Sequence, residues 1–122
     1  MVVGTGIDII EVDRVSDAAE RQSFFERVFT PQERAYFVKQ NHNPQTIAGT
    51  FAAKEATAKA LSAGFNGIKW QDIEILRDES GKPYVKLWNA AEKRMHDLGG
   101  KSIHISISHI KALAVAQAIL ED

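Results

Sequence analysis

Alternation of apolar and polar residues predicts strands at both ends of the chain. Residues 2–9 (VVGTGIDI) have the pattern of a short strand with Val3, Ile7 and Ile9 on one face. Residues 102–109 (SIHISISH) alternate without a break, so the isoleucines would face one way and the histidines and serines the other. After a turn near His109, residues 112–120 (ALAVAQAIL) would return as the antiparallel partner.

Two more strands are predicted in the second half of the chain. Residues 72–78 (DIEILRD) and 83–88 (PYVKLW) both alternate, and the residues DESGK between them have the composition of a hairpin turn. This segment therefore predicts a second antiparallel pair of strands.

Capping residues indicate where two of the helices begin. Thr30, Pro31 and Glu33 have the spacing of a capping box with proline at the first helical position, which predicts a helix over about 31–40. Asn43-Pro44 repeats the signal, and Gly64 stands where a left-handed residue commonly ends a helix. We therefore expect a long helix over about 45–62.

The remaining helices complete an α+β pattern. Residues 12–28 are amphipathic and predict one broken helix or two short ones, and Asn89 would cap a helix that ends at Gly99-Gly100. The order is then strand, helices, two strands, helix, two strands. We expect a single domain over residues 1–122, with a mostly antiparallel sheet packed on the long, buried helix.

Composition excludes several classes of function but does not identify one. Hydrophobic residues make up 44% of the chain and charged residues 25%, as in an ordinary globular domain. The net charge of −1 creates no basic field, so nucleic-acid binding is not expected. The chain has no cysteine, no segment with the order of a secretory signal, and no run near the ~18 apolar residues of a membrane helix. We expect a cytoplasmic protein without a membrane partner.

The most apolar helix carries charged residues. In FAAKEATAKAL (51–61), Phe51, Glu55 and Lys59 are four residues apart and share one stripe of the helix. Glu55 and Lys59 could form an ordinary ion pair at the rim, worth about 0.2–0.5 kcal/mol. Because the helix is apolar nearly all round and unpaired burial is costly, we interpret these charges as lining a cleft or an interface.

Asp8 provides a second carboxylate at the end of a short apolar segment. Alone it could simply accept hydrogen bonds from local backbone donors. Together with Glu55 it would make an oxygen site suited to Mg²⁺, which takes one or two carboxylates besides water and phosphate oxygens. Lys59 would then face the phosphate as a positive charge or accept a proton.

Other candidate residues are weaker. His109 lies at the end of a strand, where its side chain could contact a phosphate, although a residue of the turn is the simpler interpretation. Arg14, Arg21 and Arg27, interleaved with Phe24 and Phe25, suit an acidic amphipathic helix as partner, although they could be a solvated charged face. The sequence contains no phosphate-binding glycine loop, no histidine pair with metal-ligand spacing and no nucleophilic-serine elbow.

Three segments together resemble the holo-acyl-carrier-protein synthases, the small single-domain group of 4′-phosphopantetheinyl transferases. They are GTGIDIIEVDRV (4–15), FAAKEATAKAL (51–61) and ISISH (105–109), and the similarity extends over almost the whole chain. The resemblance implies transfer of the 4′-phosphopantetheine arm of coenzyme A to a serine of apo acyl carrier protein, releasing adenosine 3′,5′-bisphosphate, in fatty acid biosynthesis. It also implies a homotrimer with active sites at the subunit interfaces.

The resemblance assigns roles to residues. Asp8 and Glu55 would hold Mg²⁺, and Lys59 would lie near the pyrophosphate, so that these three form the catalytic set. The nucleotide end of coenzyme A would contact Gly81, Lys82, Pro83 and His109. The acidic helix of the carrier protein would dock on Arg14, Arg21, Phe25 and Arg27.

The sequence departs from the family at Thr50, where relatives commonly carry an arginine that helps bind a phosphate of the coenzyme. Lys54, Lys82 or Lys111 could compensate, and we include Lys54 among the expected coenzyme-binding residues. Ile110 also replaces a small polar residue.

The proton acceptor stays open among a metal-bound water, Glu55 and Lys59. Since carboxylates and phosphate favour a charged lysine, we favour Lys59 as charge stabiliser. Two other functions also remain possible: a magnesium-dependent pyrophosphatase or nucleotide hydrolase with the same site, and a non-catalytic adaptor for acidic helices.

Overall fold

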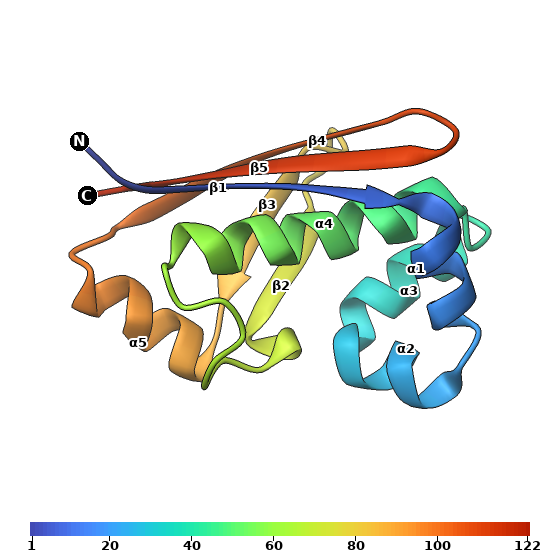
Figure 1. The fold of residues 1–122 in the computed structure, drawn as a ribbon, viewed down its shortest axis with the longest axis horizontal. Coiled ribbons are helices and arrows are strands. Elements are labelled where there is room, and N and C mark those ends of the chain that lie inside the picture. Colours follow the sequence, from blue (N-terminus) through green and yellow to red (C-terminus); the bar gives the residue numbers. More distant parts are fainter.

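The long helix α4 (Pro44–Ala60) runs through the middle of the computed structural model, which describes residues 1–122 (Figure 1). A three-stranded sheet lies along one side of α4, and a two-stranded sheet packs on another side (Figure 1). Figure 1 also shows α1, α2 and α3 gathered at one end of α4, and α5 near the other. The predicted α+β fold around a long buried helix is confirmed.

The strands divide between two antiparallel sheets. The larger sheet has the order β1-β5-β4, formed by Val2–Glu11, Leu113–Glu121 and Ser102–His109. In its register Asp8 of β1 and Ile107 of β4 both pair with Ala116 of β5, so these two residues lie level on opposite edge strands. The smaller sheet is the predicted hairpin, with β2 at Ile73–Arg77 and β3 at Pro83–Leu87.

The helices follow the predicted pattern. Residues 12–28 form two short helices, α1 (Val12–Ala19) and α2 (Gln22–Val28), and α3 spans Pro31–Lys39. Thr30 and Glu33 form the expected capping box, and Asn43 caps α4 through the backbone N–H of Thr46. A short 3₁₀ helix, η1 (Trp70–Asp72), precedes β2. None of the helices is both long and apolar enough to cross a membrane.

The predicted cap of α5 (Asn89–Asp97) is wrong. Trp88 occupies the N-cap position without a side-chain bond, and Asn89 is the first helical residue, with a φ of 48°. The Asn89 amide donates instead to Asp72 at 3.2 Å. Asparagine tolerates this left-handed conformation better than most residues do, and a contact 17 residues away is invisible to a local capping rule.

Two glycines bring β1 directly against α4. A Cβ atom on Gly6 would lie 1.9 Å from the carbonyl oxygen of Ala56, and one on Gly4 would lie 2.2 Å from that of Ala60. No larger residue fits at either position unless the strand moves away. This close approach carries Asp8, two residues beyond Gly6, to the surface of α4 that bears Glu55 and Lys59.

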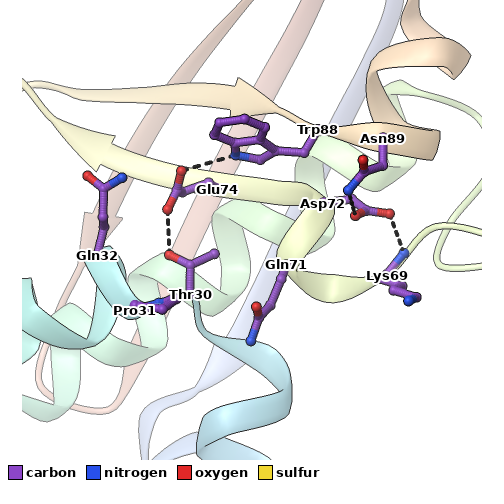
Figure 2. A pocket seen from close by; sticks show the side chains of 9 residues that line it. All are labelled: Thr30, Pro31, Gln32, Lys69, Gln71, Asp72, Glu74, Trp88 and Asn89. Atoms are coloured by element: carbon purple, nitrogen blue, oxygen red, sulfur yellow. Dashed lines mark hydrogen bonds between the residues drawn. The ribbon is translucent and has the colours of Figure 1, made fainter.

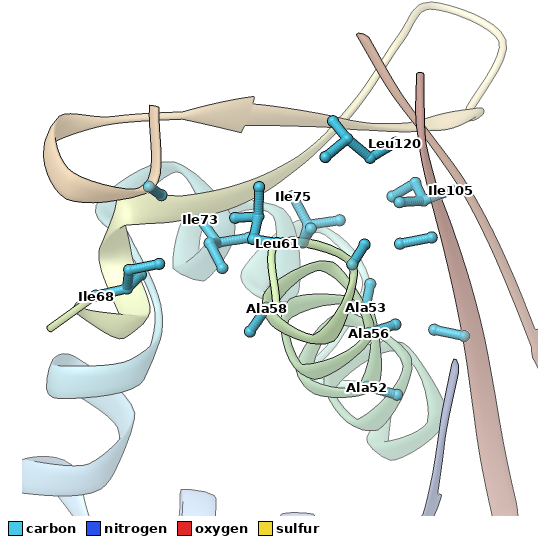
Figure 3. Close-up of a cluster of buried hydrophobic side chains, with 14 residues drawn as sticks. Ala52, Ala53, Ala56, Ala58, Leu61, Ile68, Ile73, Ile75, Ile105 and Leu120 are labelled. Atoms are coloured by element: carbon cyan, nitrogen blue, oxygen red, sulfur yellow. The ribbon is translucent and has the colours of Figure 1, made fainter. Parts of the chain in front are cut away.

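The apolar residues form two cores around α4. Figure 3 shows the larger one, in which alanines of α4 meet isoleucines of β2 and β4 and the side chain of Leu120. The second core joins α1, α2 and α3 to the start of α4, with Phe29 and Phe37 fully buried. The outer face of β1 stays uncovered in a single chain, since Ile7 and Ile9 are each 63% exposed.

Candidate active site

Asp8, Glu55 and Lys59 come together at the edge of the molecule where β1 lies on α4. The Lys59 ammonium is 3.3 Å from an Asp8 carboxylate oxygen and donates a hydrogen bond to the Ile7 carbonyl at 2.9 Å. Its side chain is about half exposed, at 52%, whereas Asp8 is 15% exposed. The set is therefore preformed and still open to a ligand.

The two carboxylates are close enough to influence each other. Partial burial raises the pKa of Glu55 above its ordinary value of 4.5, and repulsion from Asp8 raises it further, while Lys59 opposes the shift. A divalent cation between these carboxylates would remove the repulsion. No group of three or more metal-ligating side chains is present in the chain. Two carboxylates with an open side suit Mg²⁺, which keeps several waters and takes phosphate oxygens.

A second candidate site lies at the opposite edge of the sheet. A hollow of about 230 Å³ joins the start of α4, the end of β4 and the β2–β3 turn. Gly81, Pro83 and His109 line it, as do Tyr36, Gln45, Thr46, Gly49, Arg77 and Ile107. The structure thus brings together three of the four residues expected at the nucleotide end of the coenzyme. Lys82, the fourth, is exposed on the same turn.

The turn beside this hollow is held by Asp78. Its carboxylate accepts hydrogen bonds from the backbone of Ser80 and Lys82 and from the Ser80 hydroxyl, and these bonds lower the pKa of Asp78. Gly81 has a φ of 87°, a conformation that favours glycine. The turn is therefore ordered before any ligand arrives.

The expected coenzyme contact of Lys54 is wrong. Its side chain is 0% exposed, lies 2.9 Å from the Glu33 carboxylate and donates to the carbonyls of Trp70 and Ile73. Burial lowers the pKa of Lys54 and raises that of Glu33, and their contact opposes both shifts. Lys54 therefore ties α4 to β2 and α3 inside the molecule. The sequence placed it correctly in the apolar helix but could not show which way it points.

Thr50 does not reach a ligand either. It is 1% exposed, and its hydroxyl donates to the Thr46 carbonyl at 2.9 Å. Serine and threonine inside helices often satisfy themselves in this way.

Another hollow, shown in Figure 2, is rich in carboxylates but already satisfied. Glu74 accepts from the Thr30 hydroxyl at 2.6 Å and from the Trp88 indole at 3.1 Å. Asp72 accepts from Asn89 and from the backbone of Lys69 (Figure 2). We interpret this hollow as structural, since its acids join β2 to α3 and α5.

The expected docking residues occupy α1 and α2. Arg14 and Arg21 border one shallow surface with Asp17 and Ala18, and Arg27 is exposed in the last turn of α2. Phe25 is half-buried and packs on Phe29 and Phe37. Arg14 and Arg21 are thus available together, whereas Phe25 also belongs to the aromatic core.

Comparisons with known proteins identify the family of the chain. The family model described as 4′-phosphopantetheinyl transferase superfamily matches residues 4–117. A holo-[acyl-carrier-protein] synthase of Alkaliphilus oremlandii is 52% identical over 120 residues, covering 98% of each chain. Among solved structures, the Neisseria meningitidis holo-[acyl-carrier-protein] synthase has a TM-score of 0.91 at 30% identity, covering 100% of both chains. A Bacillus anthracis holo-(acyl-carrier-protein) synthase, solved in complex with CoA (3′,5′-ADP), has a TM-score of 0.81 at 37% identity, covering 100% of this chain and 98% of the other. The chain therefore belongs to the 4′-phosphopantetheinyl transferase superfamily.

Proposed function

We propose that this protein is a magnesium-dependent holo-acyl-carrier-protein synthase. It transfers the 4′-phosphopantetheine arm of coenzyme A to a serine of apo acyl carrier protein, for fatty acid biosynthesis in the cytoplasm. The observation that carries the proposal is the preformed set of Asp8, Glu55 and Lys59 in a chain 52% identical to a holo-[acyl-carrier-protein] synthase. A phosphoryl transfer needs little more from its enzyme than positioning and positive charge.

The reaction exchanges one phosphorus–oxygen bond for another. The serine hydroxyl of the carrier protein gives its proton to Glu55 or to water, and its oxygen bonds to the phosphorus that bears the pantetheine arm. The bond from that phosphorus to the bridging oxygen breaks. Adenosine 3′,5′-bisphosphate leaves with the bonding electrons. Negative charge grows on the leaving phosphate, and a cation near it lowers the barrier.

Lys59 supplies this cation from the protein. It donates to the Ile7 carbonyl and lies 3.3 Å from an Asp8 carboxylate oxygen, so it is held beside the carboxylates. We assign Lys59 to charge stabilisation rather than to proton abstraction. Asp8 and Glu55 would hold Mg²⁺. When bound, the ion would neutralise pyrophosphate oxygens as charge moves to the leaving group.

The positions of the two candidate sites favour an assembly with shared active sites. Asp8 lies on β1 and His109 on β4, which are opposite edges of the sheet about 10 Å apart, and the body of α4 lies between Glu55 and the hollow. A coenzyme bound by both sites of one chain would have to bend around α4. Contact between the β1 edge of one subunit and the β4 edge of the next would bring both sites to one ligand.

Such a contact joins two different surfaces of the chain. Repeated from subunit to subunit, it forms a closed ring when the rotation between neighbouring subunits divides a full turn evenly. The uncovered outer face of β1, with Val3, Ile7 and Ile9, gives an apolar surface for the contact. Together with the family resemblance, this supports a homotrimer with three active sites at its interfaces. The acidic helix of the carrier protein would dock on Arg14, Arg21, Phe25 and Arg27 of α1 and α2.

The test is the intact mass of apo acyl carrier protein after incubation with this protein, coenzyme A and Mg²⁺. We expect a gain of one phosphopantetheine arm, and its loss with a chelator or with Glu55→Ala. Phosphate release from nucleotides without carrier protein would favour a hydrolase instead. Binding of carrier protein with no mass gain, unchanged by Glu55→Ala, would favour a non-catalytic adaptor.

A further inference from the structure

We infer that Arg77 is the residue that binds the 3′-phosphate of coenzyme A. The inference rests on the proposed function, because it names a contact of the same substrate. Arg77 is the last residue of β2 and lines the hollow that also contains Gly81, Pro83 and His109. It is the only lysine or arginine in the lining of that hollow.

The guanidinium of Arg77 forms no ion pair with a carboxylate. Its Nη1 atom is buried without a hydrogen-bond partner. Because Arg77 makes no ion pair within the chain and lines a polar hollow, its guanidinium is available to an anionic ligand. The guanidinium lies over the Tyr36 ring, 5.0 Å from its centroid. This cation–π contact restricts the position of the guanidinium before a ligand binds.

The chemistry of the hollow indicates a phosphate. Guanidinium donors match phosphate oxygens in pairs, and such charge-assisted bonds are stronger than neutral ones. His109 also lines the hollow and can add a further donor, and Gly49 lets the Ile107 side chain pack closely on α4 beside it. The pantetheine arm offers only neutral amide and hydroxyl acceptors, which bind a guanidinium less strongly than the charged oxygens of a phosphate do.

The position of the hollow indicates which phosphate. Coenzyme A carries a pyrophosphate and one ribose 3′-phosphate, and the pyrophosphate belongs with Asp8, Glu55 and Lys59. Among the other cations of this region, Lys54 is enclosed by protein, and Lys82 and Lys111 are exposed and do not line the hollow. Thr50 carries no charge and is buried. Arg77 is thus the cation placed for the 3′-phosphate.

A cycle of two proteins and two ligands tests this. Calorimetry would measure the binding of coenzyme A and of 3′-dephospho-coenzyme A to the wild type and to Arg77→Gln. We expect Arg77→Gln to weaken coenzyme A binding about 10- to 100-fold, as for loss of a charged hydrogen bond, and to change dephospho-coenzyme A binding less than about twofold. Arg77→Lys should keep part of the preference for coenzyme A. Lys93→Gln, which removes an exposed charge on α5, should behave as wild type.

Two results would overturn the inference. Equal weakening for both ligands would mean that Arg77 shapes the hollow or serves another part of the nucleotide, and unchanged binding of coenzyme A would exclude the contact. Circular dichroism of each variant detects unfolding, and Arg77→Lys keeps the test valid if Arg77→Gln unfolds. The proposed function can fail separately. If the wild type prefers coenzyme A to the dephospho form but modifies no carrier protein, the role of Arg77 stands and the transferase activity is refuted.

Discussion

The ammonium of Lys59 lies 3.3 Å from a carboxylate oxygen of Asp8, although 51 residues separate them in sequence. The contact depends on Gly4 and Gly6, which let β1 lie on the carbonyl groups of α4. A lysine ammonium has three donors, of which the Ile7 carbonyl and Asp8 take two. The third donor has no acceptor within the chain, so under the proposed function it would serve a phosphate oxygen of the coenzyme.

Lys59→Arg should keep measurable transferase activity, whereas Lys59→Met should lose about 100-fold or more in kcat, as expected for removal of a charge-stabilising donor. Arginine keeps the positive charge but is a very poor proton acceptor. The measurement is the rate of mass gain of the carrier protein at saturating coenzyme A. An arginine variant that folds and binds coenzyme A but is as inactive as Lys59→Met would contradict the assigned role.

Glu55→Gln should abolish activity and slightly stabilise the metal-free protein. The pKa of Glu55 is higher in the folded protein than in the unfolded chain, where it is about 4.5. As the pH rises above this value, Glu55 ionises more readily in the unfolded chain, and the free energy of unfolding therefore falls. Glutamine removes that cost, which we expect to be below about 1 kcal/mol because the group is partly exposed. Urea unfolding at pH 7.5 with a chelator measures it, and a less stable variant would contradict the expected repulsion. At pH 3.5 the difference should vanish.

The Mg²⁺ concentration for half-maximal activity should rise as the pH falls. Protons compete with the metal for Glu55, and the raised pKa makes this competition begin above pH 4.5, the ordinary value. Activity at limiting Mg²⁺ should therefore decline on the acid side and recover when more Mg²⁺ is added. An acid-side decline that saturating Mg²⁺ leaves unchanged would show that a different group controls it.

The pattern of the sequence was sufficient for most elements of the fold. Strand alternation and the caps at Thr30 and Asn43 are local signals, and the structure contains the elements that they predict. Local rules failed where a partner is distant in sequence, as for Asn89, whose amide contacts Asp72, and for Lys54, whose acceptors come from three other segments. Periodicity placed Lys54 in an apolar helix, but its direction depends on tertiary packing.

The site was predictable only in part for the same reason. Asp8, Glu55 and Lys59 could be grouped from residue type and the resemblance, since carboxylates and a lysine are a recognisable set. Arg77 gave no such signal, because an arginine at a strand end is usually solvated. Its unpaired, buried Nη1 becomes apparent only when Tyr36 of α3 is placed beside it. Glu33 was expected only as a capping residue, yet it also accepts from Lys54 and Ile75.

Lys54→Met should destabilise the protein by about 3–5 kcal/mol, because it leaves the Glu33 carboxylate buried without its cation. The double variant Lys54→Met with Glu33→Gln should lose less than the sum of the two single changes, since no unpaired charge remains. Urea unfolding of the four proteins gives the coupling. Lys93→Met, which breaks the exposed pair with Asp97, is the matched control and should cost less than about 0.5 kcal/mol. Additive effects would mean that Lys54 and Glu33 act independently.

Two inactive variants should restore each other's activity if the active site is shared between subunits. Asp8→Asn removes one ligand of the proposed metal site of a chain, and His109→Ala changes only its hollow. Each active site of the ring would take Asp8 from one subunit and His109 from its neighbour. In a ring refolded from equal amounts of both variants, a site is active only when the first of these subunits has Asp8 and the other has His109. Each condition holds with probability one half, so about a quarter of wild-type activity should return. Mass gain of the carrier protein measures it.

The exposed face of β1 supplies the control for this rescue. Ile9→Glu in both chains should prevent it, because the apolar contact between subunits would acquire unpaired charges. Val38→Glu is the matched change, since Val38 on α3 is equally exposed at 63% but lies away from β1. It should leave the rescue and the sedimentation mass unchanged. If mixing restores nothing although native mass spectrometry detects mixed trimers, each chain must complete its own site, and the coenzyme would have to bend around α4.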